Sequence, residues 1–314
     1  MNTLYIIGNG FDLHHGLPTS FQGFREYSRS SNFHRLYENG VFMMLADQSL
    51  AEHWNKLEKN LANFDVNDLI EQAKEYYDDD PHENQFLYEV KTAIDSITTG
   101  LVTELHNYLS KAEAQPATPN TFLALDTSAR FINFNYTNTL ERIYNIPSHN
   151  ICYIHGKLSS SSSIVIGHGM VDPDYEPKPS VDFSKLSEDE FQAYVDAYSQ
   201  DYEDAVSEAY EYFKISYKDT EACLEAASSF LQELAVIDNV IILGHSMAEI
   251  DQIYFYYINQ IVRPTCRWWA SYYLSSEKTT MLECLEEIVG DHDRINVFEL
   301  CQLLVLNELK DDKN

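Results

Sequence analysis

The chain has 314 residues, and its 44% hydrophobic and 13% aromatic content is typical of a globular protein with a large core. Its 21 basic and 50 acidic residues give a formal net charge of −29, which disfavours nonspecific binding to nucleic acid or to an anionic membrane. No apolar run is long enough to span a bilayer. The five cysteines form no C-x-x-C pair, so they indicate neither a zinc ribbon nor a disulfide framework, and we expect a cytoplasmic protein.

The first predicted element is a short strand that ends in a glycine turn. Residues 4–7 are a continuous apolar run, which is typical of a strand buried on both faces of a parallel sheet. Gly8 and Gly10 follow, and free backbone N–H groups in such a turn favour a phosphate. Because Leu13 stands where the G-x-G-x-x-G pattern requires its third glycine, a tight turn without a ligand explains this stretch equally well.

Two helical segments are predicted as insertions in one α/β domain that spans residues 1–314. The first covers about 33–115, with a break at 78–81, where three aspartates precede a proline. The second covers about 170–235, and within it residues 186–213 are rich in acidic and aromatic residues at helical spacing. We expect an acidic amphipathic helix that covers the core, rather than a binding element for a cation.

Further strands are predicted from apolar runs at 130–135, 151–154, 239–243, 267–274 and 295–298. The last three alternate with predicted helices at about 252–262 and 278–289. Strands that alternate with helices imply parallel βαβ units. The sequence therefore predicts an α/β fold with a Rossmann-like, doubly wound, mostly parallel sheet that carries helical insertions.

Four of these strands end in polar residues. The strand ends are Gly8-Asn9-Gly10, residues 133–137, His155-Gly156 and Gly244-His245-Ser246. Taken singly, each is ambiguous, because His155 can be a hydrogen-bonded structural residue and Asn135 can cap a helix. In an open parallel sheet, however, ligands bind outside the carboxyl ends of the strands. The recurrence of polar residues at equivalent places favours a ligand crevice.

A set of short motifs links these strand ends to a known family. The motifs are residues 4–21, Trp54–Glu58, Phe134–Thr137, Ile154–Gly156 and Gly244–Ser246, together with Asp251. They resemble the AbiH-type bacteriophage abortive-infection proteins, and the resemblance extends from residue 4 to about 260. That family in turn resembles the sirtuin-like domains of phage-defence proteins, which hydrolyse NAD.

The resemblance implies a toxin-like effector of abortive infection that hydrolyses NAD at the nicotinamide N-glycosidic bond. His155 would be the general base, and a histidine is suited to accept a proton near neutral pH. Asn135 would hold the nicotinamide-side ribose or the attacking water. Thr137 stands where the sirtuin-like pattern has an aspartate, and Asp12 is the candidate carboxylate in its place.

The resemblance also implies contacts with NAD as the substrate. Gly8 and Gly10 would approach the pyrophosphate, and Ser246 would contact a phosphate or a ribose hydroxyl. The predicted cofactor-binding residues are Gly8, Asn9, Gly10, Phe11, Thr137, Gly244, His245, Ser246 and Asp251. No metal is expected, since the histidines show no H-x-x-x-H or H-E-x-x-H spacing and the sirtuin zinc ribbon is missing.

Three alternatives remain open at the level of sequence. The chain binds NAD or a related nucleotide as a non-catalytic sensor, which the Thr137 departure favours. The second alternative is a metal-dependent nuclease or phosphatase that uses Asp12 with histidines. The third is a transferase that moves ADP-ribose to a target. The expected partners are NAD or a related nucleotide, and a homo-oligomer or a regulatory protein, with no nucleic acid and no membrane.

Overall fold

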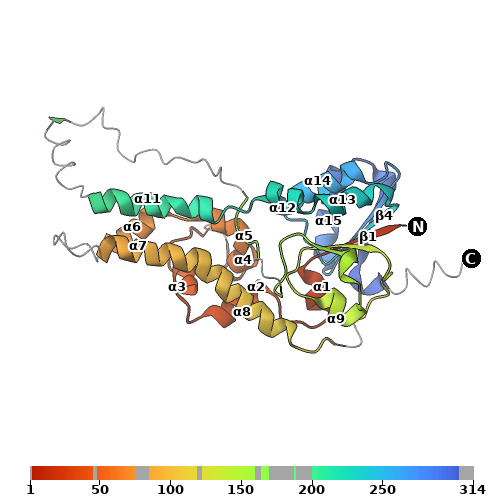
Figure 1. Ribbon diagram of the computed structural model, residues 1–314, viewed down its shortest axis with the longest axis horizontal. Helices are drawn as coiled ribbons and strands as arrows, with labels where there is room; N and C mark the ends of the chain where they lie inside the picture. The colour runs from red at the N-terminus through yellow and green to blue at the C-terminus, as the bar shows by residue number, and fades with distance from the viewer. Residues whose placement is uncertain are drawn as a thin grey trace, which may run out of the picture. The chain divides into compact units, whose positions relative to one another are not determined.

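The computed structural model describes residues 2–44, 48–74, 85–118, 122–159, 164–169, 187–188 and 200–303. The chain divides into two compact units, shown in Figure 1. Unit 1 comprises Met1–Gly23, His106–Val165 and Asp219–Asn314, and unit 2 comprises Phe24–Leu105 and Ile166–Lys218. Unit 2 overlaps the two segments predicted as helical insertions, but it begins and ends earlier in each. Residues 24–32 and 166–169 belong to unit 2, whereas residues 106–115 and 219–235 belong to unit 1.

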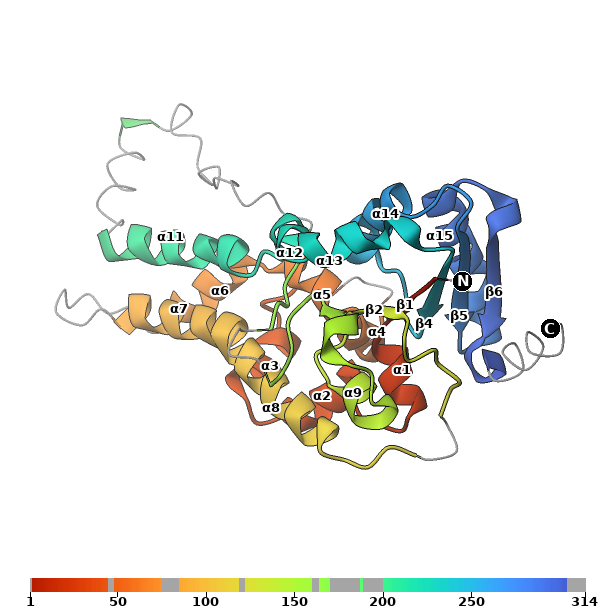
Figure 2. The ribbon, with the colours of Figure 1, turned by 45° about the vertical axis from the view of Figure 1, so that its right-hand side comes forward.

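Unit 1 is built on a six-stranded parallel sheet with the order β3-β2-β1-β4-β5-β6. Figure 2 labels β1, β2, β4, β5 and β6 of this sheet. The strands are β1 (Thr3–Ile7), β2 (Arg130–Asn133), β3 (Ile151–Tyr153), β4 (Asn239–Leu243), β5 (Arg267–Tyr272) and β6 (Ile295–Glu299). This order is that of a doubly wound Rossmann-like sheet, in which the direction of winding reverses beside β1. The predicted α/β fold is therefore confirmed.

Both faces of the sheet are buried, which explains the continuous apolar runs. In β1, Leu4 and Ile6 belong to one core cluster, whereas Tyr5 and Ile7 belong to the other. Successive side chains of a strand point to opposite faces, so a strand between two helical layers has no polar side. The first face is covered by α13 (Ser228–Gln232), α14 (Gln252–Ile261) and α15 (Lys278–Val289), and the second by α1 (Asn9–His14) and α9 (Thr139–Tyr144).

Unit 2 consists mainly of helices around an aromatic core. Trp54 is fully buried, and its ring meets Phe24 and Phe33 edge to face. Its indole N–H donates to Glu38 Oε1 at 2.8 Å, and the same oxygen accepts from Arg25 Nε at 2.7 Å. A buried indole needs such a partner. The Trp54 motif thus supports unit 2 and lies outside the sheet-bearing unit.

Two helical segments of the first insertion differ from the predicted pattern. The helix that carries Trp54 breaks at Lys56, between α4 (Leu50–Asn55) and α5 (Leu57–Asn60). The second half of this predicted helical segment contains a π-helical turn that joins two α-helices. Its parts are α7 (Gln85–Asp95), the π-helical Ser96–Gly100 and α8 (Leu101–Glu113). The remaining helices of this region are α2 (Phe21–Ser28), α3 (Asn32–Glu38) and α6 (Val66–Ala73).

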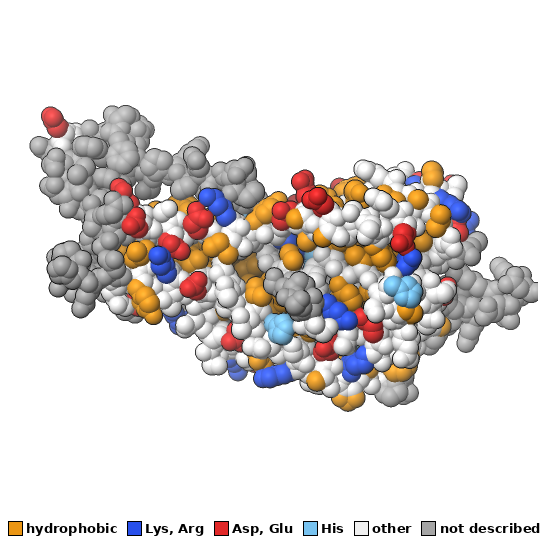
Figure 3. All heavy atoms as spheres, in the orientation of Figure 1, with side chains coloured by type: hydrophobic (Ala, Val, Ile, Leu, Met, Phe, Trp, Pro, Cys, Tyr) orange, Lys and Arg blue, Asp and Glu red, His pale blue; other side chains and the backbone are white. Residues whose placement is uncertain are grey.

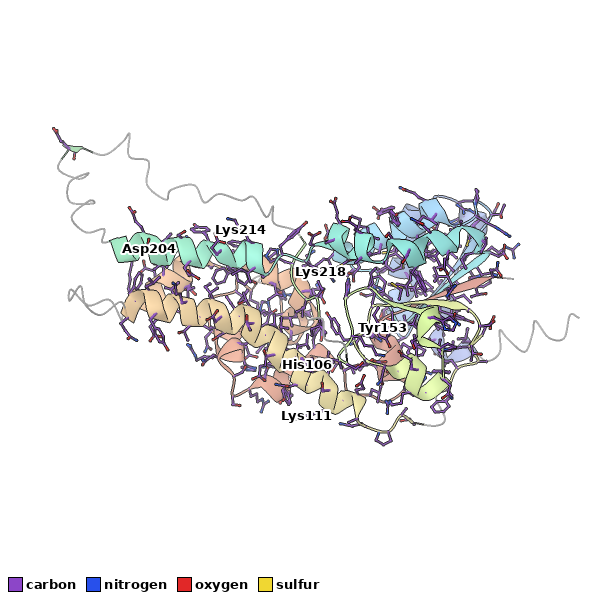
Figure 4. All side chains as sticks on the ribbon, in the orientation of Figure 1. His106, Lys111, Tyr153, Asp204, Lys214 and Lys218 are labelled. Atoms are coloured by element: carbon purple, nitrogen blue, oxygen red, sulfur yellow. The ribbon has the colours of Figure 1, made fainter. Side chains whose placement is uncertain are left out.

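The second insertion contributes α11 (Gln200–Ile215), an amphipathic helix. It buries Ala205, Ala209 and Tyr212, and it exposes Asp204 and Lys214, which Figure 4 labels along the helix. Figure 3 shows acidic side chains over α11 and α7. An acidic amphipathic helix is thus confirmed over these residues. It packs against α7 and α6 within unit 2, so the core that it covers is that of unit 2 and not that of the sheet.

Some predictions fall outside the described residues, namely the helix break at 78–81 and the aromatic residues 191–198 of the acidic segment. Within the described ranges, none of the helices combines the length and apolar composition that crossing a bilayer requires.

Candidate functional site

The predicted site residues all lie in unit 1, where the strand ends meet at one edge of the sheet. Ile7 at the end of β1 is level with Asn133 of β2 on one side and with Leu243 of β4 on the other. The polar turns after these strands therefore begin at the same height. The structure thus brings together residues from four parts of the chain that are far apart in sequence.

The glycine turn after β1 packs against the turn after β4. The N–H of Gly8 donates to Leu243 O at 3.0 Å, and that of Gly10 donates to Gly244 O at 2.7 Å. The N–H of Phe11 donates to Gly8 O at 2.9 Å. The expectation of free N–H groups that attract a phosphate is wrong for these three, because protein carbonyls already accept from them.

The glycines are required by close approach of the protein's own backbone. A Cβ added at Gly8 would lie 2.5 Å from His245 Cα, and one at Gly10 would lie 2.8 Å from Gly244 Cα. Heavy atoms that are not bonded to each other do not approach so closely. The turns after β1 and β4 can therefore pack closely here because their glycines have no side chains.

Other predicted contact residues of the first turn have roles within the protein. Asn9 and Thr19 pair twice, with Asn9 Nδ2 donating to Thr19 O at 3.1 Å and Thr19 Oγ1 donating to Asn9 Oδ1 at 2.6 Å. The side chain of Phe11 is fully buried in the core cluster beneath α1. Asn9 and Ser246 are both exposed. Because the side chain of Asn9 is already paired with Thr19, Ser246 is the more available of the two to a ligand.

Asp12 is a buried carboxyl group held by a threonine. Thr137 Oγ1 donates to Asp12 Oδ2 at 2.5 Å, and the Thr139 hydroxyl lies 3.1 Å from that of Thr137. Among the described residues, Asp12 Oδ1 has no hydrogen-bond partner. Thr137 thus stands where an aspartate was expected, and it binds a carboxylate that comes from another strand end.

Burial raises the pKa of Asp12 to about 6, while the hydrogen bond from Thr137 acts in the opposite direction. The unfolded chain keeps a pKa near 3.8, so the folded protein binds more protons between about pH 4 and 6. The free energy of unfolding should therefore fall as the pH rises through this window. Asp12→Asn removes this dependence but keeps an oxygen that can accept from Thr137.

We therefore expect Asp12→Asn to gain about 3 kcal/mol of stability relative to wild type between pH 4 and 7. Urea unfolding of both proteins at several pH values measures the difference. Parallel stability curves would contradict the raised pKa of this carboxyl group.

Asn135 joins the turn after β2 to the turn after β1. Its Nδ2 donates to Gly8 O at 3.0 Å, and its backbone N–H donates to Asn133 Oδ1 at 3.0 Å. The side chain is buried. It does not cap the following helix, because α9 has Asn138 at its N-cap position. The helix-capping alternative is therefore wrong, and Asn135 lies at the junction of the two turns.

Two buried histidines share one carboxylate. Asp251, the last residue of the short helix η8 (Glu249–Asp251), directs Oδ1 toward His155 Nε2 at 3.9 Å and Oδ2 toward His245 Nε2 at 3.7 Å. His155 Nε2 also lies 3.2 Å from Tyr254 Oη. The sequence predicted the two histidines and the aspartate as separate contacts, and the structure brings them together.

Two aromatic residues complete this cluster. The Phe134 ring meets both imidazoles edge-on, with its centroid 5.2 Å from that of His155 and 4.3 Å from that of His245. The sequence indicated Phe134 only as part of a motif, and it gave no prediction for Tyr254. Tyr254 follows Asp251 by three residues at the start of a helix, and this spacing is the signal that would have placed the two side chains on one face.

Two basic residues that follow the ends of β3 and β2 in the sequence are engaged with protein groups. Lys157 Nζ donates to Glu141 Oε1 at 2.7 Å, and Arg142 donates to Gln115 O at 2.7 Å. The buried imidazole of His15 contacts Phe11 O and Tyr144 Oη. Within the part of the chain that the structure describes, no group of three or more His, Cys, Asp or Glu side chains is arranged to hold a metal ion.

Comparison with known proteins identifies one family. The family model described as "Bacteriophage abortive infection AbiH" matches residues 4–272, which include all of the strand-end residues above. No curated protein and no solved structure matches the chain.

Proposed function

The chain belongs to the bacteriophage abortive infection AbiH family, and on that premise we propose that it is a phage-defence effector that hydrolyses NAD. One observation carries the proposal. The ends of β1 to β4 bring a buried aspartate, an asparagine and two histidines to one edge of a sheet with the strand order of dinucleotide-binding folds. This combination favours a nucleotide substrate and acid–base chemistry at the same edge.

In the proposed reaction the bond between nicotinamide nitrogen and ribose C1′ breaks, and its electron pair stays with nicotinamide. Water attacks C1′, and His155 takes the proton that this water loses. The products are nicotinamide, ADP-ribose and one proton. A positioned general base of this kind typically contributes about 100- to 10,000-fold to a rate.

The buried carboxylate of Asp12 suits the charge that develops in this reaction. Positive charge accumulates on the ribose as nicotinamide leaves, and fixed negative groups stabilise it. Asp12 has a pKa of about 6, so it is mostly ionised at pH 7, and its Oδ1 lacks a hydrogen-bond partner among the described residues. We therefore assign Asp12 to charge stabilisation and Asn135 to holding the ribose or the attacking water.

The contacts of the glycine turn change the expected binding of the pyrophosphate. The N–H groups of Gly8, Gly10 and Phe11 already bond to protein carbonyls. Ser246 is exposed at the turn after β4 and is the better candidate for a phosphate or ribose contact.

The test is incubation of the purified full-length chain with NAD, with free nicotinamide and ADP-ribose quantified by chromatography. An abortive-infection effector must be quiet before infection, so the assay is run with and without lysate from phage-infected cells. We expect equal release of both products, and we expect Asn135→Ala to lose most of it. His292→Gln is the matched control, because His292 is exposed at the surface.

Other results would favour the alternatives. NAD binding without product formation in either condition would favour a non-catalytic NAD sensor over an NAD hydrolase. ADP-ribose attached to a macromolecule would identify a transferase. Activity that appears only with added magnesium or zinc, on nucleic acid or phosphoesters, would identify a metal-dependent hydrolase.

A further inference from the structure

The arrangement around Asp251 assigns it a role of its own. Its two oxygens face two different imidazoles, each through the Nε2 atom. A carboxylate that only bound a ligand would leave at least one oxygen turned toward the ligand. Here both oxygens turn toward histidines from different strand ends, His155 after β3 and His245 after β4.

The hydrogen bonds of His245 fix which nitrogen carries its proton. Its Nδ1 accepts from the backbone N–H of Met247 at 2.9 Å, so in the neutral ring the proton is on Nε2 and faces Asp251. Met247 provides this N–H from a left-handed backbone conformation with φ of 51°, which is costly for a residue other than glycine. A strained turn that presents an N–H to a histidine indicates that the orientation of this ring matters.

Asp251 and Tyr254 hold His155 from the start of α14. Tyr254 follows Asp251 by three residues, so both side chains lie on the side of the helix that faces His155 Nε2. The side chains of His155 and His245 are 4% and 5% exposed, whereas that of Asp251 is 13% exposed. The carboxylate is therefore the member of the group closest to solvent.

We propose that Asp251 is a positioning residue whose carboxylate is shared by His155 and His245, holds both rings in one unit and raises the basicity of each. This inference rests on the proposed function, in which His155 is the general base. When His155 takes a proton, the Asp251 carboxylate balances the new charge, and His245 is held by the same group. The described contacts place His155, His245, Asp251 and Tyr254 as the titratable groups that face one another, with the apolar Phe134 beside them.

The test measures the two imidazoles directly and does not depend on NAD turnover. In protein with ¹⁵N-labelled histidine, long-range ¹H–¹⁵N spectra report the tautomer and pKa of each ring, and His155→Gln and His245→Gln identify the signals. In Asp251→Asn, both imidazole pKa values should fall by about one unit, because an opposite charge within about 4 Å is removed. Glu249→Gln, which removes a charge two residues away, should leave both unchanged.

A second variant keeps the inference testable if Asp251→Asn does not fold. In His245→Gln, the pKa of His155 should rise, because one imidazole then has the carboxylate to itself. Unchanged His155 titration in either folded variant would overturn the shared unit, whatever the outcome of the NAD assay. If NAD is hydrolysed, the acidic limb of the pH–rate profile should move to lower pH in Asp251→Asn, with kcat affected more than KM.

Discussion

His155→Ala should lower the turnover of NAD by a factor of about 100 to 10,000, which is the range that a general base contributes. Because the variant keeps the Asp251 carboxylate, the loss of activity would be due to the missing imidazole and not to a change in that negative charge. Because His155 is almost fully buried, it contributes little surface for binding NAD. We therefore expect kcat to fall and KM to stay near the wild-type value. Initial rates of nicotinamide release over a range of NAD concentrations measure both constants.

Truncation of a buried ring also leaves a cavity, so this prediction needs a packing control. His155→Gln keeps part of the volume against Phe134 and should lose as much activity as His155→Ala while losing less stability. His292→Gln should match wild type in both respects. Wild-type turnover in a folded His155 variant would remove His155 from the mechanism and leave Asp12 as the remaining candidate for proton transfer.

The strands and several helices could be predicted because their signals are local. β1 and β4 are continuous apolar runs for the physical reason that helices cover both faces of the sheet. The helix at 278–289 was predicted with the bounds that α15 has, since its buried residues recur at helical spacing and Gly290 ends it. The polar residues at the strand ends could also be predicted, because each directly follows an apolar run and its signal is therefore local.

The contacts between residues of the site could not be predicted from the sequence. Thr137 and Asp12 are 125 positions apart, and only the parallel pairing of β1 with β2 brings them within hydrogen-bond distance. Thr137 therefore suggested that the expected carboxylate is absent, although Asp12 supplies one from another strand end. The glycines gave a partial signal in the same way. They showed that something approaches the turn closely, but a sequence does not say whether that is a ligand or another turn.

Substitution of Gly244 by alanine should destabilise the protein by about 4 kcal/mol. Gly244 has a φ of +63°, and an added Cβ would lie 2.2 Å from Phe11 N. The left-handed conformation costs a residue with a Cβ about 1–2 kcal/mol, and overpacking typically costs a further 1–3 kcal/mol. Because the contact is with backbone, no side chain can rotate away to relieve it.

Two other glycines separate these contributions. Gly290 has a φ of +70° and nothing within 4 Å of an added Cβ, so Gly290→Ala should cost only the conformational part, about 1–2 kcal/mol. Gly8 has a φ of −120°, so Gly8→Ala should cost only the steric part, about 3 kcal/mol. Urea unfolding of the three variants should therefore rank Gly244 first, Gly8 second and Gly290 last. If Gly244→Ala is no worse than Gly290→Ala, the two turns can separate at low cost, and the space between them would then be open to a ligand after all.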